Sequence, residues 1–174
     1  TFLPWGYKNI LLREGKTCTM RFMKVGIFGL GRFGTLWARL LSTRFSVVAY
    51  NRTRRTAPTE SIPLVDLETL GTCDMLFICT AISSVEEVIR HVAPVLKPGA
   101  VVADTCSVKV YPVECMKRIL PAHVSILGTH PMFGPDSARN GVEGLPLILC
   151  PVRISGEDYA YWRTVFFSYG MRVV

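Results

Sequence analysis

A glycine-rich hexapeptide, Gly-Leu-Gly-Arg-Phe-Gly at positions 29–34, most constrains what this chain can fold into. It follows a predicted strand at 24–29 and opens a predicted helix at 32–44, and a second apolar strand is predicted at 46–51. Glycines in this setting permit a tight turn, close approach to a pyrophosphate and close helix–strand packing. The helix would then direct its amides and dipole at a dinucleotide. The expected cofactor contacts are Gly29, Gly31, Arg32, Phe33 and Gly34.

Short apolar strands and amphipathic helices alternate through the rest of the chain. Strands are predicted at 75–79, 100–104, 125–129, 146–150 and 171–174, and helices at 84–92, 113–120 and from 155 onward. Ser84 and Glu87 have the spacing of a capping box that would begin the first of these helices. The alternation predicts an α/β fold, a doubly wound, mainly parallel sheet of the Rossmann type with helices on both faces. We expect one NADP-binding domain over 23–174 and leave 1–22 as an unassigned N-terminal extension.

Composition excludes several classes of function. The net charge of +7 comes from scattered basic residues without a nucleic-acid motif, so we expect no nucleic-acid partner. No apolar run is long enough for a membrane span, and no cysteines and histidines have the spacing of metal ligands. The cysteine pattern favours a reducing, cytoplasmic compartment. The basic segment 1–22 is open to three interpretations: a remnant of a plastid transit peptide, an artificial extension, or a wrongly chosen start before Met23.

The end of the second predicted strand bears on the choice of cofactor. NAD-binding domains usually place a carboxylate there, which bonds the ribose hydroxyls and would repel a 2′-phosphate. Here the chain reads Asn51-Arg52-Thr53-Arg54-Arg55, and no carboxylate follows before Glu60. Such a run is often only a solvated loop, but the missing acid and the added cations both favour NADP. We expect Asn51, Arg52 and Thr53 to contact the cofactor.

Two further segments fall at predicted carboxyl ends of strands, where open α/β sheets bind their ligands. One contains Ser107 and Lys109, and the other contains His130. A neutral imidazole can accept a hydroxyl proton while a hydride leaves the same carbon. His130 is therefore a candidate catalytic base that Ser107 could orient, although a loop histidine satisfied by backbone is an equally good interpretation of the spacing alone.

The run Gly-Thr-His-Pro-Met-Phe-Gly-Pro at 128–135, with Ser-Val-Lys at 107–109 and the glycine-rich hexapeptide, resembles the prephenate and arogenate dehydrogenase family. The resemblance extends over about 23–174. It implies oxidative decarboxylation of arogenate or prephenate with NAD or NADP, in tyrosine biosynthesis. It also implies His130 as the catalytic base, Ser107 as the residue that orients it, and Thr80 and Ala81 as lining of the cofactor channel. Lys109 is either a cation behind the serine or a surface residue, and we favour the surface position.

The family's helical dimerisation domain, which supplies further substrate-binding residues, is not found in this sequence. We therefore expect the chain to bind cofactor but to turn over poorly alone, and the full-length protein to be a homodimer. Two alternatives stay open. A β-hydroxyacid dehydrogenase would share the glycine-rich opening and the Asn-Arg-Thr strand end but would not explain 128–135. A non-catalytic NADP-binding module would regulate a partner instead.

Overall fold

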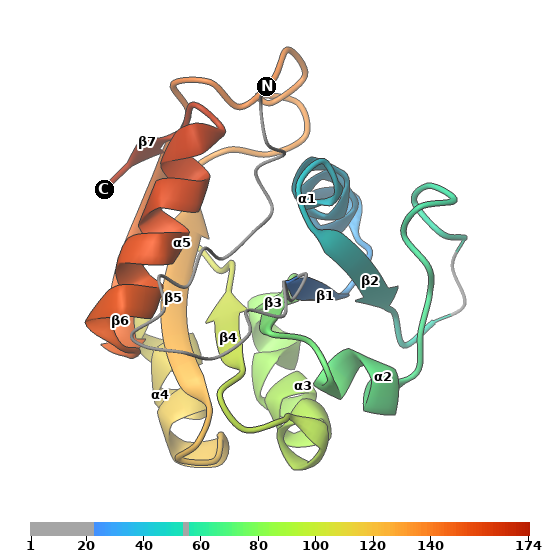
Figure 1. Ribbon diagram of the computed structural model, residues 1–174, viewed down its shortest axis with the longest axis vertical. Helices are drawn as coiled ribbons and strands as arrows, with labels where there is room; N and C mark the ends of the chain where they lie inside the picture. Colours follow the sequence, from blue (N-terminus) through green and yellow to red (C-terminus); the bar gives the residue numbers. More distant parts are fainter. Residues whose placement is uncertain (1–22, 54–55) are drawn as a thin grey trace, which may run out of the picture.

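The computed structural model describes residues 23–53 and 56–174, and a seven-stranded sheet organises them (Figure 1). The unassigned segment 1–22 and two of the expected cations, Arg54 and Arg55, lie outside the described residues. The strands are β1 (Lys24–Phe28), β2 (Ser46–Tyr50), β3 (Met75–Ile78), β4 (Val101–Asp104), β5 (Ser125–Pro131), β6 (Pro146–Arg153) and β7 (Arg172–Val173). They lie in the order β2-β1-β3-β4-β5-β6-β7. All neighbouring pairs are parallel except β5 and β6.

Helices cover both faces of this sheet (Figure 1). One face packs against α1 (Arg32–Ser42) and α5 (Gly156–Ser168). The other packs against α2 (Leu67–Gly71), α3 (Val85–Val92) and α4 (Val110–Ile119), with short 3₁₀ turns η1 (Ile82–Ser84) and η2 (Ala93–Val95) between them. The predicted doubly wound, mainly parallel α/β fold is confirmed.

The two faces have separate cores because successive side chains of a strand point to opposite sides. On β3, Phe77 packs toward α1 and α5, whereas Leu76 and Ile78 pack toward α3 and α4. The first core is aromatic. Trp37 of α1 lies 5.7 Å from Phe77 and also 5.7 Å from Phe166 of α5, measured between ring centroids. These contacts fix the helix that carries the glycine-rich turn.

Aromatic packing also joins this turn to the segment after β5. The rings of Phe33 and Phe133 lie 6.3 Å apart, and Phe133 lies 6.2 Å from Trp37. Phe133 is 8% exposed, whereas its neighbour Met132 is 54% exposed. The aromatic residue of the His-Pro-Met-Phe run therefore belongs to the core and holds two loops of the sheet edge together.

Several predicted elements were wrong in detail at their ends; β6, for example, runs to Arg153 rather than to 150. Ser84 occupies the N-cap position of α3, but its hydroxyl makes no capping hydrogen bond, and its backbone is already helical because η1 runs directly into α3. Helix α4 begins at Val110 rather than at 113, because Pro112 lies in its first turn, where a missing N–H breaks no helical bond. Strand β5 extends past 129 and pairs with β6 as far as Pro131.

Helix α2 was not predicted at all. It has five residues, too few for an apolar periodicity to be visible in the sequence. Its start did carry a local signal, since Asp66 caps it by accepting from the Thr69 N–H at 2.8 Å. Hydrogen bonds from the side chain and the backbone N–H of Thr69 hold the pKa of Asp66 below its usual value.

Candidate cofactor site and active site

The glycine-rich turn is so tight that a side chain would not fit at Gly29 or at Gly34. A Cβ on Gly34 would lie 1.9 Å from Gly29 O, and a Cβ on Gly29 would lie 2.6 Å from Cys79 O. Gly29 also has a φ of 101°, which side-chain-bearing residues rarely adopt. A Cβ on Gly31, in contrast, would meet no atom within 4 Å. Gly29 and Gly34 are thus needed for the fold of the turn, while Gly31 faces open space.

The start of α1 fits a diphosphate. Gly31 is its N-cap, no side chain caps the helix, and no acidic residue occupies its first turn. Within the described part of the chain, no side-chain cap accepts from the leading amides, and the space beside Gly31 is open. Unsatisfied amides together with the positive end of the helix dipole bind phosphate groups. The turn can hold the pyrophosphate of a dinucleotide.

The end of β2 is tied to this turn by Asn51. Its Oδ1 accepts from the Leu30 N–H at 2.8 Å, and its Nδ2 donates to Thr53 O at 2.7 Å and to Thr53 Oγ1 at 2.9 Å. One amide side chain therefore fixes the glycine-rich turn and the loop after β2 relative to each other. Asn51 was predicted as a direct cofactor contact, and in the structure both ends of its amide already have protein partners.

A cavity opens beside Asn51, between the end of β2 and α3. The loop after β2 contributes Arg52, whose Nη1 lies 2.9 Å from Oε1 of Glu87 on α3. The lining consists of Phe28, Gly29, Tyr50, Asn51, Arg52, Thr53, Thr80, Ser84, Glu87, Val88 and His91. Five of the predicted cofactor residues meet here, and Glu87 adds a carboxylate that the sequence had indicated only as part of a helix cap.

A second cavity lies on the other side of Thr80, over the ends of β3 and β4. Its lining consists of Gly31, Arg32, Phe33, Cys79, Thr80, Ile82, Thr105, Cys106, Ser107 and Val108. The hydroxyl of Thr80 is buried and has no hydrogen-bond partner among the described residues, so it is available to a ligand. Burial raises the pKa of Cys79 to about 12 and that of Cys106 to about 11. Both are neutral thiols near pH 7 and act as apolar wall.

A buried ion pair supports the floor of this second cavity. Asp104, at the end of β4, is fully buried, and its Oδ2 pairs with Nζ of Lys109 and accepts from the Cys106 N–H at 3.0 Å. Nζ of Lys109 also donates to Thr129 O at 2.5 Å, next to His130. Burial raises the pKa of Asp104, and Lys109 offsets part of that rise. The surface position that we favoured for Lys109 is wrong: its side chain is 20% exposed and connects β4 to β5.

His130 lies within β5, next to the last residue of the strand, and pairs with Ile148 of β6. It is partly buried. No hydrogen bond joins Ser107 to His130 within 23–53 and 56–174, and Ser107 is exposed. His130 lines neither of the two cavities described above, whereas Ser107 lines the second. Their catalytic roles stay predictions, as does the cofactor contact of Ala81, which is exposed at the start of η1.

Arg32 of the glycine-rich turn reaches across to the segment after β5. Its Nη2 lies 2.8 Å from both carboxylate oxygens of Asp136. The two side chains are 74% and 72% exposed, so water competes strongly for this contact. Of the two residues, Arg32 lines the second cavity.

The described residues hold neither of two further classes of site. In that part of the chain, His, Cys, Asp and Glu side chains nowhere gather in threes where they could hold a metal ion. No helix there is both long and apolar enough to cross a membrane.

A mainly parallel sheet with a tight glycine-rich turn at the head of its first helix defines a nucleotide-binding domain of the Rossmann type. Residues 59–174 match the family model described as prephenate dehydrogenase, nucleotide-binding domain. The chain belongs to the prephenate dehydrogenase family. The matched range begins after the glycine-rich turn at 29–34.

Arogenate dehydrogenase 1, chloroplastic, of Arabidopsis thaliana is 32% identical over 143 residues, which are 78% of this chain and 22% of that protein. The crystal structure of Synechocystis arogenate dehydrogenase superposes with a TM-score of 0.74 at 27% identity, over 87% of this chain and 59% of that one. An Aquifex aeolicus prephenate dehydrogenase, solved with hydroxyphenyl propionate and NAD+, shares the fold with a TM-score of 0.70 at 20% identity, over 90% of this chain and 60% of that one. The chain therefore spans about a fifth of the Arabidopsis relative and about three fifths of the two solved chains.

Proposed function

We propose that this chain is the cofactor-binding domain of an NADP-dependent dehydrogenase that oxidatively decarboxylates arogenate or prephenate. The names of the relatives support the reaction, since the Arabidopsis protein is called an arogenate dehydrogenase and the Aquifex structure a prephenate dehydrogenase with NAD+. The complete protein acts as a homodimer whose helical domain completes the substrate site.

One observation carries the proposal: a single cavity joins the glycine-rich turn to the segment that contains Ser107. Gly31, the free hydroxyl of Thr80 and Ser107 all line it. A dinucleotide with its diphosphate on the α1 amides would extend in one direction toward Arg52 and in the other toward Ser107. The nicotinamide end then lies over the ends of β3 and β4, where ligands of open α/β sheets bind.

The bound cofactor supplies the hydride acceptor, and residues of this chain accept the proton and hold the reacting groups in position. A hydride leaves the ring carbon that bears the hydroxyl, and His130 takes the hydroxyl proton on an imidazole nitrogen. The electron pair of the breaking bond to the carboxylate completes the aromatic ring as carbon dioxide leaves. Lys109 holds the carbonyl of Thr129, the residue before His130, and thereby fixes the strand end that presents the imidazole.

The choice of cofactor is tested by Arg52→Asp. Arg52 is the described cation nearest to the expected 2′-phosphate, and its charge reversal should weaken NADPH binding much more than NADH binding. Fluorescence titration of the chain with each cofactor measures both affinities. Equal losses for the two cofactors would exclude a 2′-phosphate beside Arg52.

The chemical role is tested by His130→Asn in the full-length native protein. Because His130 lines neither cofactor cavity, NADPH affinity should stay nearly unchanged while turnover of both candidate substrates is abolished. Retained turnover would exclude His130 as the base. A full-length wild-type protein that binds NADPH without oxidising either substrate would instead favour the non-catalytic module.

A further inference from the structure

The cavity beside β2 contains a carboxylate that the β2 strand end itself lacks. Asn51, Arg52 and Thr53 carry no acid, yet Glu87 on α3 places its carboxylate 2.9 Å from the guanidinium of Arg52. Both side chains line the same cavity, and they are 65% and 57% exposed. A hydroxyl-accepting group and a phosphate-binding group thus stand next to each other at the position expected for the adenosine ribose.

The two forms of the ribose make opposite demands on this pair. The 2′-hydroxyl of NAD is a hydrogen-bond donor and is best met by a carboxylate, whereas the 2′-phosphate of NADP is an anion and is best met by a guanidinium. A phosphate that binds Arg52 must displace the Glu87 carboxylate or lie close to it, which adds a repulsion between like charges. Since the pair is exposed, its separation costs little, so either ribose can be accepted.

We propose that Glu87 sets the selectivity of this site between the two cofactors, by accepting from the 2′-hydroxyl of NAD and by competing with the 2′-phosphate of NADP for Arg52. This inference rests on the proposed function, because it needs a dinucleotide in this cavity. Glu87 is a specificity-determining residue that lowers a preference for NADP rather than creating one. The loop after β2 therefore does not alone determine which cofactor binds, because Glu87 of α3 weakens the preference for NADP that Arg52 gives.

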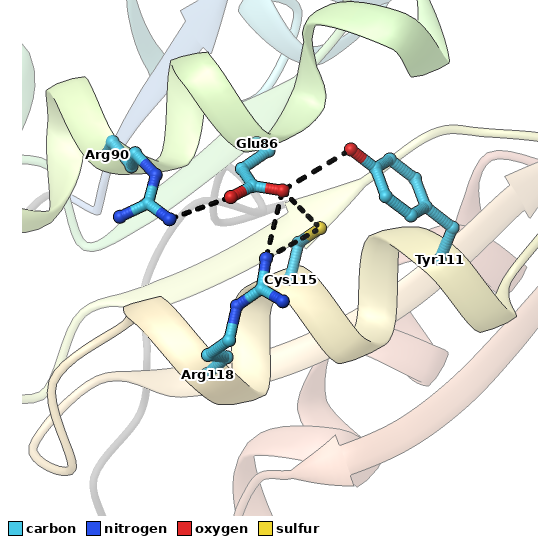
Figure 2. Close-up of polar contacts among 5 residues, drawn as sticks. All are labelled: Glu86, Arg90, Tyr111, Cys115 and Arg118. Carbon is cyan, nitrogen blue, oxygen red and sulfur yellow. Dashed lines mark hydrogen bonds and ion pairs between the residues drawn. The ribbon is translucent and has the colours of Figure 1, made fainter.

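The neighbouring acid on α3 provides a matched control. Glu86 points toward α4, and its carboxylate lies 2.7 Å from Nη2 of Arg90 on α3 and 2.9 Å from Nη2 of Arg118 on α4 (Figure 2). It also faces Tyr111, and it is not part of the lining of the cofactor cavity (Figure 2). Glu86→Gln removes the same charge one residue away and leaves the Arg52 contact in place.

The test is calorimetric titration of the chain and its variants with NADP+, NAD+ and two adenosine fragments. The fragments are adenosine 2′,5′-bisphosphate and AMP, which differ only at the 2′ position and do not require the nicotinamide half of the site. Glu87→Gln should tighten the bisphosphate by about tenfold and weaken AMP by a few fold, as expected for one charge removed beside a phosphate. Glu86→Gln should change the ratio of the two affinities by less than about twofold.

The failures of the two proposals are distinguishable. If wild-type chain binds neither the dinucleotides nor the fragments, the proposed function fails and this inference fails with it. If wild type binds both fragments and Glu87→Gln leaves their affinity ratio within twofold of wild type, only this inference fails. An equal change of the ratio in Glu86→Gln would also overturn it, because the effect would then come from net charge rather than from contact with Arg52. Thermal melts of both variants check that the fold is intact.

Discussion

Two ion pairs at the same edge of the sheet have opposite character. The pair of Arg52 and Glu87, at the cavity beside β2, joins side chains that are 65% and 57% exposed. The pair of Lys109 and Asp104, beneath the cavity over β4, joins side chains that are 20% and 0% exposed. A ligand or water can replace the first contact cheaply, but separating the second uncovers a buried charge. The difference divides the site into a part that can adapt to its ligand and a part that holds its shape.

The largest expected effect comes from breaking the buried pair. Lys109→Met should lower the free energy of unfolding by about 3–5 kcal/mol, because it leaves the carboxylate of Asp104 buried without its cation. Urea denaturation followed by tryptophan fluorescence measures the loss. Adding Asp104→Asn to the same chain should recover more than half of it, since the uncompensated charge is then gone. A loss below about 1 kcal/mol in the single variant would mean that the pair is no more structural than an exposed one.

The next effect separates the two roles of glycine in the turn. Gly34→Ala should cost about 1–3 kcal/mol of unfolding free energy, because its Cβ would meet Gly29 O at 1.9 Å and α1 would have to shift. Gly31→Ala should leave stability nearly unchanged, since its φ of −69° suits alanine and the space around its Cβ is open. It should still weaken NADPH binding by about tenfold or more, which is about 1.4 kcal/mol. Unchanged NADPH affinity in Gly31→Ala would argue against a diphosphate above α1.

A smaller effect is the pH dependence of the buried carboxylate. The folded pKa of Asp104 is raised by burial, so the folded chain keeps this proton at pH values where the unfolded chain has lost it. Stability from this group is therefore highest below the ordinary aspartate pKa and falls as the pH rises toward the raised one. In Lys109→Met the pKa of Asp104 should rise further, so the total stability lost as the pH rises should grow by about 1.4 kcal/mol for each further unit of pKa rise. Urea titrations at pH 4.5 and pH 8 compare the variant with wild type, and an equal or smaller loss between the two pH values in the variant would contradict the assignment.

The sequence predicts the backbone of this site better than it predicts which of the charged side chains form pairs. The glycine-rich turn and the strands that lead to the site were predicted, because they depend on local spacing and on strand periodicity that a single chain displays. The partner of Glu87 was not, because it depends on how α3 packs beside β2, and Arg52 lies 35 residues away in the chain. Lys109 was misjudged for the same reason: its partner Thr129 is 20 residues distant, and burial of Asp104 between β3 and β5 has no local signature. Long-range pairing of charged side chains follows from tertiary packing and leaves little trace in spacing.

The smallest expected effect lies at the exposed pair. Arg52→Gln and Glu87→Gln should each change the free energy of unfolding by less than about 0.5 kcal/mol, because exposed ion pairs contribute little beyond what water supplies. Arg118→Gln should cost more than either, since its partner Glu86 is 30% exposed and their contact joins α3 to α4. Urea denaturation of the three variants at one ionic strength ranks them. If Arg52→Gln destabilised the chain as much as Arg118→Gln, the guanidinium would be needed for folding, and a ligand could not take it from Glu87 without weakening the domain.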